Sequence, residues 1–193
     1  MKGYTSKTAV ENYTLQTIDA SFNTQITAWI TAIENFIDQF TGRNFVADTE
    51  DTERVYDGNG STKIIIDDFI SITTVELGED EDTRVEVDSD DYRFYPANTL
   101  PKRKIMLKSG YFTTGYQNVI VTGKFGYSVA CPADITLAAT VLVAGITNFS
   151  NNAKGKVRSE TIGRYSVTYS TDKGWADFNR AKEILNFYKK YTF

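Results

Sequence analysis

The spacing of apolar residues changes twice along the chain, and this limits the folds it can adopt. From residue 22 to residue 41 apolar side chains recur every three or four positions, as on one face of an amphipathic helix. From about residue 52 to residue 128 they alternate with polar residues in short runs, as in antiparallel strands. After residue 132 the helical spacing returns. We therefore predict an α+β protein: a small helical bundle with an antiparallel β-sheet inserted between its second and third helices.

Two helices are expected before the sheet. The first covers about residues 6–19, with Thr5 or Ser6 as its N-cap. The second covers residues 22–41, and Gly42 follows its last apolar position, where a left-handed C-cap residue belongs. The apolar positions of this second helix are Phe22, Ile26, Trp29, Ile30, Ile33, Ile37 and Phe40.

The middle segment is predicted to form six or seven strands. Asp57-Gly58-Asn59-Gly60 indicates the turn after the first strand, and residues 78–82 indicate a charged hairpin tip. Asp67-Asp68 is predicted to lie at a turn and not to form an acid–base pair, because adjacent residues of a strand point to opposite faces. The predicted strands are Thr52–Tyr56, Lys63–Ile66, Ile70–Leu77, Thr83–Val87, Tyr92–Tyr95, Lys104–Leu107 and Asn118–Tyr127.

Two further helices are expected after the sheet. Residues 133–150 are apolar around most of the helix, which indicates packing on several sides, by the same chain or by neighbours. Apolar and polar residues alternate from Tyr165 to Tyr169, which predicts a short strand or an extended loop. Lys173–Lys190 is predicted to form the last helix. The predicted domains are a helical core of residues 1–47 and 129–193 and a β insertion of residues 48–128.

Composition excludes most catalytic and metal chemistry. Histidine is absent and there is one cysteine, so the chain has no imidazole base, no His-ligated zinc, no iron–sulfur site and no internal disulfide. Cys131 is expected to be a structural residue at the start of a helix. Asp88-Ser89-Asp90-Asp91 lacks the glycine and the distal glutamate of an EF-hand, and Gly58-Asn59-Gly60 lacks the Lys-Ser/Thr of a phosphate loop. We expect no enzyme activity, no metal and no cofactor.

The net charge of −4 is unevenly distributed. Residues 48–91 hold sixteen acidic and three basic side chains, a net charge of −13, whereas residues 101–193 hold fourteen basic and five acidic ones, a net charge of +9. Either each region has a solvated, like-charged face, or the acidic region of one subunit meets the basic region of the next. An acidic surface also repels nucleic acid.

No run of about 20 apolar residues, the length that spans a bilayer, occurs in the chain. Residues 1–5 lack the apolar core of a signal peptide, so we expect the protein to be made and kept inside a cell. Lys154, Lys156, Arg158 and Arg164 form a basic cluster in a predicted loop, which is either a solvated loop, a subunit contact or a contact to a phosphate backbone.

Four segments in order resemble the head–tail connector (head completion or adaptor) proteins of tailed bacteriophages. Ile37-Asp38-Gln39-Phe40-Thr41-Gly42-Arg43-Asn44-Phe45 is similar to the end of the family's amphipathic helix. Thr52–Gly60 resembles the turn that opens the family's β insertion, and Ile64–Val75 resembles the strand after it. Gly155–Tyr169 is similar to the family's S-E-x-I-G-x-Y-S-V-x-Y segment, with a terminal helix following.

The resemblance implies a structural virion protein of the neck, made in the host cytoplasm. Such a subunit is expected to form a ring, expected to be twelvefold, below the portal protein. The ring would extend the DNA channel and dock the stopper or the tail-terminator protein. DNA would pass through the channel without sequence-specific binding, and no contact with a membrane is expected. The residues we assign to portal or subunit contacts are Lys154, Lys156, Arg158, Arg164, Tyr165, Tyr188 and Phe193.

Two other functions fit the residues alone. One is another neck or tail-completion protein of a phage or prophage. The other is a cellular binding module whose acidic β-sheet recognises a basic partner. Neither requires a catalytic site.

Overall fold

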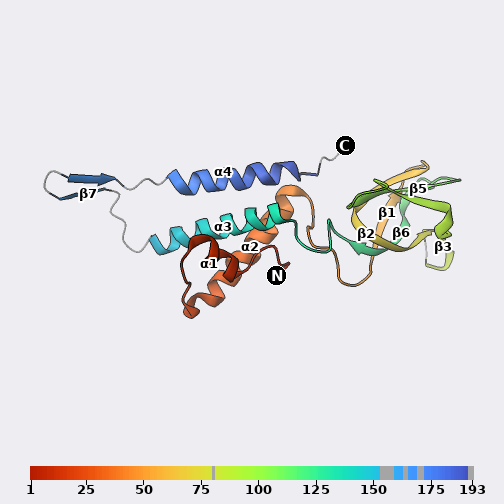
Figure 1. Ribbon diagram of the computed structural model, residues 1–193. Coiled ribbons are helices and arrows are strands. Elements are labelled where there is room, and N and C mark those ends of the chain that lie inside the picture. Colours follow the sequence, from red (N-terminus) through yellow and green to blue (C-terminus); the bar gives the residue numbers. More distant parts are fainter. Residues whose placement is uncertain (80, 153–158, 163–164, 169–171, 191–193) are drawn as a thin grey trace. The chain divides into compact units, whose positions relative to one another are not determined.

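The computed structural model describes the chain except residues 80, 153–158, 163–164, 169–171 and 191–193. Its helices and antiparallel six-stranded sheet confirm the α+β class, with the sheet inserted between the second and third helices (Figure 1). The chain divides into two compact units, a helical unit of residues 1–43 and 131–193 and a β unit of residues 44–130.

The helical unit begins with two helices whose ends follow capping rules. The Ser6 hydroxyl accepts the Ala9 N–H at 3.1 Å and starts α1, as one of the two predicted N-caps. Gly42, with φ 69°, ends α2 as predicted. The first helix is shorter than predicted because Leu15 adopts a left-handed conformation with φ 55°. The helices are α1 (Lys7–Thr14), η1 (Ala20–Phe22), α2 (Asn23–Thr41), α3 (Ala133–Asn152) and α4 (Asp172–Phe187).

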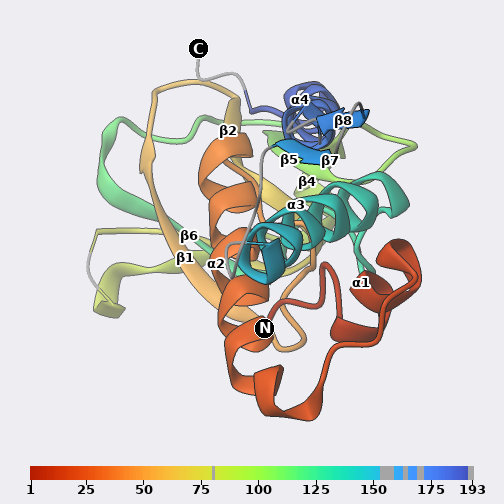
Figure 2. The same ribbon diagram turned by 90° about the vertical axis from the view of Figure 1, so that its left-hand side faces the viewer.

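Helix α3 is the centre of the helical unit. It packs against α1, α2 and α4, and α4 runs back along it (Figures 1 and 2). Val143 and Ala144 lie in one cluster with Val10 of α1 and with Ile26 and Ile30 of α2. The prediction that this helix packs on several sides is confirmed, and its alanines allow the neighbouring helices to approach closely.

A short hairpin lies between α3 and α4 in the sequence. Strand β7 (Ser159–Ile162) pairs antiparallel with β8 (Tyr165–Thr168), so that Ile162 faces Tyr165. Tyr165 therefore begins a strand, one of its two predicted states. Its partner strand β7 could not be predicted from the sequence, because Ser159–Ile162 shows no alternation of apolar residues on its own.

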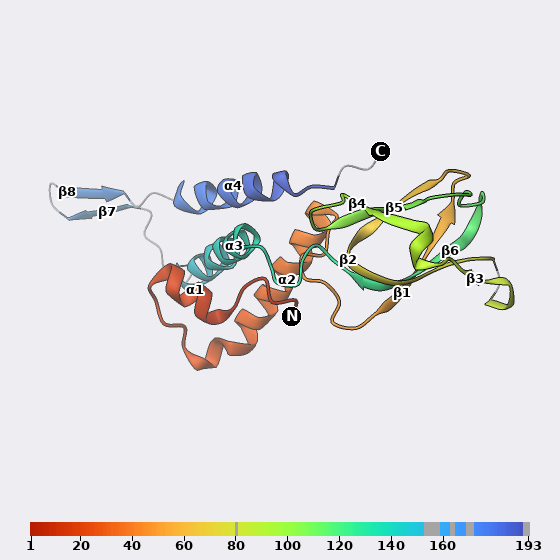
Figure 3. The ribbon, with the colours of Figure 1, turned by 45° about the vertical axis from the view of Figure 1, so that its right-hand side comes forward.

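The β unit is one curled sheet of antiparallel strands in the order β1-β6-β2-β5-β4, with β3 paired to one end of β2 (Figure 3). Phe69 and Phe94 pack edge to face in its core, with ring centroids 5.1 Å apart. The strands are β1 (Thr52–Gly58), β2 (Lys63–Leu77), β3 (Val85–Glu86), β4 (Tyr92–Tyr95), β5 (Lys102–Leu107) and β6 (Gly115–Phe125).

The turn predicted at Asp67-Asp68 is wrong, since β2 is one continuous strand through both residues. At Phe69 the strand changes its main partner from β5 to β6, with register shifts on both sides. These shifts absorb the bend that the sequence indicated as a turn. Asp67 is held by Arg54, and Asp68 is buried at 5 % exposure.

The segments that enter and leave the β unit lie side by side at one end of the sheet. The Ala47 N–H binds the Ser128 carbonyl at 2.9 Å, and the Asp48 N–H binds the Phe125 carbonyl at 2.9 Å. At the opposite end Gly58 pairs with Gly115. The loops at that end are therefore far along the strands from the point where the chain enters the unit.

Candidate interaction surfaces

The predicted contact residues are only partly described. Lys154, Lys156, Arg158, Arg164 and Phe193 lie outside the described residues. Tyr165 is the first residue of β8. Tyr188 is described at the end of α4, where its hydroxyl lies 3.2 Å from a carboxylate oxygen of Asp134 at the start of α3.

The Thr41-Gly42-Arg43 segment that carried part of the resemblance joins the ends of α2 and α4. Arg43 donates from Nε to the Tyr188 carbonyl at 2.5 Å, and the Lys190 N–H binds the Thr41 carbonyl at 2.7 Å. The Lys189 ammonium lies 5.1 Å from the centre of the Phe40 ring. The motif therefore fixes the chain that follows α4 onto α2.

The N-terminal segment is anchored by two carboxylates of α2. Glu34, only 1 % exposed, accepts the Lys2 N–H at 2.7 Å and the Tyr4 N–H at 3.0 Å. Asp38 accepts the hydroxyl of the fully buried Tyr4 at 2.6 Å and pairs with the Lys2 ammonium. A buried carboxylate is tolerated here because backbone donors satisfy it. No apolar pattern in the sequence marked Glu34 as a buried residue.

Asp57 and Gly58, the last two residues of β1, have a structural role in the β unit. The Gly58 N–H binds the Asn118 side-chain oxygen at 2.7 Å, and the Asn118 amide donates to the Thr113 carbonyl at 2.9 Å. Asp57 accepts the N–H of Gln117, which has φ 53°, at 2.7 Å. These residues therefore join the end of β1 to the start of β6 and to the loop before β6.

Arg54 neutralises part of the acidic region. Its guanidinium lies 2.9 Å from Asp67, 3.6 Å from Asp48 and 4.2 Å from the centre of the Phe125 ring. Burial, and then the nearby charge of Asp67, raise the pKa of the Tyr56 hydroxyl, which lies 3.3 Å from that carboxylate. Arg84 likewise lies 3.5 Å from Glu53.

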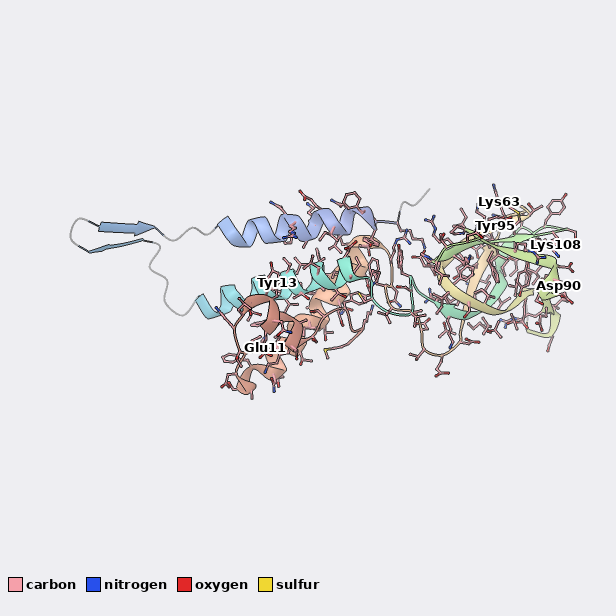
Figure 4. The ribbon with its side chains drawn as sticks, in the orientation of Figure 1. Glu11, Tyr13, Lys63, Asp90, Tyr95 and Lys108 are labelled. Atoms are coloured by element: carbon pink, nitrogen blue, oxygen red, sulfur yellow. The ribbon has the colours of Figure 1, made fainter. Side chains whose placement is uncertain are left out.

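A second surface, which the sequence analysis missed, lies on the outer face of β4, β5 and the first half of β2. Ile65 is opposite Lys104, which is opposite Tyr95, and Lys63 is opposite Met106, which is opposite Arg93. Opposed residues share one face of a sheet. Figure 4 shows Lys63 and Tyr95 on the same side of the β unit. We call this surface, with Lys102 two positions before Lys104, the basic face.

The basic face has an apolar centre that solvent reaches. Ile65 is 63 % exposed and Tyr95 is 37 % exposed, whereas the alternate residues Ile64 and Ile105 point into the core. The alternation of β5 was the signal that could have marked Lys102 and Lys104 as outward-facing. Their neighbours on β2 and β4 could not be found without the strand order.

The described residues hold no group of three or more acidic or cysteine side chains that could bind a metal ion. Among the same residues, no helix combines the length and the apolar character required to cross a bilayer. Burial raises the pKa of the half-buried Cys131 thiol, with the charges of Glu34 and Asp38 adding to the effect. A thiol with a raised pKa is a poor nucleophile at neutral pH.

The same fold occurs in neck structures. A chain in the "Neck of empty GTA particle computed with C6 symmetry" aligns with a TM-score of 0.55 at 10% identity, covering 88% of this chain and 80% of that one. A chain in the "Neck of native GTA particle computed with C12 symmetry" gives a TM-score of 0.53 at 12% identity, with 91% and 85% covered. A chain in the virion of the native gene transfer agent (GTA) particle gives 0.54 at 12% identity, with 96% and 89% covered.

No curated protein matches the chain at a significant level. The model of the head completion protein family matches residues 5–191, which is nearly the whole chain. This range includes the described α-helices α1 to α4 and the entire β unit. The chain therefore belongs to the head completion protein family.

Proposed function

We propose that this protein is a structural subunit of the head–tail neck that assembles as a ring below the portal, extends the DNA channel and docks the stopper or the tail. The observation that carries the proposal is the family match over residues 5–191. The recurrence of the fold in necks computed with C6 and C12 symmetry supports a closed ring. We propose twelve subunits, since sixfold symmetry is contained in twelvefold symmetry.

The work of such a subunit is geometric, and we propose that it catalyses no reaction. DNA would pass through the channel without sequence-specific contacts. The protein would be made in the host cytoplasm and incorporated into the virion. We propose residues 1–47 and 129–193 as the connector core and residues 48–128 as an insertion, which agrees to within a few residues with the two compact units.

Lys154, Lys156 and Arg158, with Arg164 and Tyr165, are proposed to contact the portal or a neighbouring subunit, and Tyr188 and Phe193 to lie near the portal. A triple charge reversal, Lys154→Glu, Lys156→Glu and Arg158→Glu, tests the basic residues. We expect loss of ring or portal assembly with an unchanged circular dichroism spectrum. Unchanged assembly would remove this assignment and leave the neck role intact.

The neck role itself is tested by mixing the purified protein with purified portal protein and imaging the products by negative-stain electron microscopy. We expect a second ring on one end of the portal and a particle mass raised by a whole number of subunits. A protein that never joins the portal but joins purified tails would instead be a tail-completion protein. A protein that stays monomeric in both mixtures would contradict a connector.

A further inference from the structure

We propose that the basic face of one subunit binds the acidic hairpin, residues 78–79 and 82–86, of a second copy of the same chain. The inference rests on the ring proposed above and identifies one contact between its subunits. The two patches are different parts of one molecule, so the contact is head-to-tail. Contacts of this kind generate rings when the rotation between subunits closes.

The basic face presents cations without carboxylate partners. The Lys102 ammonium donates hydrogen bonds to the Pro96 and Ala97 carbonyls. The Arg93 guanidinium donates hydrogen bonds to the Asp90 and Tyr92 carbonyls. The Lys104 ammonium lies 5.9 Å from the centre of the Tyr95 ring. No ion pair described for the chain includes Lys63, Arg93, Lys102 or Lys104. An acidic partner would neutralise their mutual repulsion.

The acidic hairpin offers the complementary chemistry. Its described carboxylate side chains are Glu79, Asp82 and Glu86, and its strand β3 presents Val85, which is 68 % exposed. Thus an exposed aliphatic side chain lies among acids on the hairpin, and the exposed Ile65 lies among cations on the basic face. Apolar contact at the centre with charged pairs around it is the usual anatomy of a protein interface.

The acidic hairpin is held in place by its own subunit but is not neutralised by it. The Gly78 N–H binds the Asn118 carbonyl at 3.1 Å, and β3 pairs with Glu76 and Leu77 of β2. Its cation, Arg84, pairs with Glu53 of β1 and not with an acid of the hairpin. Both described ends of the hairpin are therefore attached to the sheet, and its described acids Glu79, Asp82 and Glu86 are exposed, which lowers the entropy lost on binding.

The basic face lies on the other half of β2, where the strand pairs with β5 at Lys63, Ile64 and Ile65. The hairpin pairs at Glu76 and Leu77, near the opposite end of this 15-residue strand. DNA is the other polyanion that a basic face could bind. The second copy is favoured because residues 48–91 carry a net charge of −13 in the same β unit, which opposes DNA binding.

Cysteine cross-linking tests the proposed proximity. Ile65→Cys and Val85→Cys are placed in separate copies of a Cys131→Ser protein, and the two are mixed under oxidising conditions in which the unaltered protein forms rings with portal. We expect a mixed disulfide dimer that forms at least about tenfold faster than with the matched control Val55→Cys, an exposed valine on β1. Equal rates for Val85→Cys and the control would overturn the inference.

Charge exchange tests the chemistry. Lys63→Glu with Lys104→Glu, and separately Asp82→Lys with Glu86→Lys, should each weaken subunit association roughly 100-fold, measured by mass photometry. All four changes together should restore association, because the charges are then complementary again. Restored association cannot arise from misfolding. The inference would be overturned if neither pair of substitutions weakened association, or if the fourfold variant did not recover it.

The outcomes separate this inference from the proposed function. Rings that form normally on portal with all three charge variants would overturn the hairpin contact and retain the neck role. An unaltered protein that never forms rings would overturn both. Binding of a fluorescent DNA duplex that is lost with Lys63→Glu and Lys104→Glu, while ring formation is unchanged, would assign the basic face to nucleic acid instead.

Discussion

The carboxylate of Glu34 accepts the backbone N–H of Tyr4 at 3.0 Å from a position only 1 % exposed to solvent. Since the same carboxylate also accepts the Lys2 N–H at 2.7 Å, one side chain of α2 satisfies two donors of the N-terminal segment. We predict that Glu34→Gln destabilises the protein by about 2 kcal/mol, because an amide NH₂ replaces one of the two acceptors. Urea unfolding measures the change. Glu183→Gln, the same substitution at an exposed position of α4, should have almost no effect.

Gly58→Ala should destabilise the β unit by about 1–3 kcal/mol. A Cβ at this position would lie 1.9 Å from the Thr113 carbonyl oxygen and 2.8 Å from the Asn118 side-chain oxygen. The loop before β6 would have to move, which breaks the hydrogen bonds that join it, through Asn118, to the end of β1. Thermal unfolding measures the loss, and an unchanged melting temperature would contradict the described approach of this loop to Gly58.

Gly145→Ala should stabilise the protein, in contrast to Gly58→Ala. Gly145 lies inside α3, and a Cβ there would meet no atom of the described residues within 4 Å apart from the neighbouring backbone of its own helix. Alanine in a helix interior is favoured over glycine by about 0.5–1 kcal/mol, so the variant should unfold at a higher urea concentration. If it instead folds stably but forms rings poorly, a neighbouring subunit occupies that space.

Arg43→Ala should release the end of α4. The guanidinium Nε binds the Tyr188 carbonyl at 2.5 Å, and its loss should cost about 1 kcal/mol. Hydrogen exchange should accelerate for the amides of residues 185–190 more than for those of α1. Arg180→Ala, at an exposed position of α4, is the matched control. Equal exchange in the two variants would show that the helix end is held in another way.

Alkylation of Cys131 should be slow at neutral pH and should reach half of its maximal rate only at a pH above the pKa of an ordinary cysteine. Burial raises the pKa of this thiol, so the folded protein holds less thiolate at a given pH than the unfolded chain does. For the same reason the thiol's contribution to stability is present at low pH and is lost as the pH rises through the raised pKa. The alkylation rate, followed by mass spectrometry with and without urea, measures the shift; identical curves would contradict it.

Strongly periodic elements were predictable from the chain alone. The helix from Asn23 to Thr41 and its glycine cap, the strand Tyr92–Tyr95 and the apolar helix α3 all follow local rules of spacing and capping. Errors occurred where a tertiary contact overrode the local pattern. Asp67 and Asp68 lie within a strand because Arg54 binds one and the fold buries the other.

Some residues of the candidate contacts could be found from the sequence alone, and others only from the tertiary structure. The basic cluster at Lys154–Arg164 was visible as a run of like charges, whereas the basic face combines residues of β4 and β5 with residues from the first half of β2, which is distant in sequence. Local charge density can find the first kind of surface. The second kind requires the strand order and the register, which depend on long-range pairing.

The sequence by itself determined the class of the fold, the helix–sheet–helix order, the absence of histidine chemistry and the family resemblance, because each depends on residue type and local spacing. Only the tertiary structure decided which charges are neutralised within the subunit and which remain for a partner. Arg54 and Glu34 meet their partners through contacts between distant segments, while Lys63 and Lys104 lie on the same open face of the sheet. The free energy of a charge depends on its neighbours in space, and folding alone brings those neighbours together.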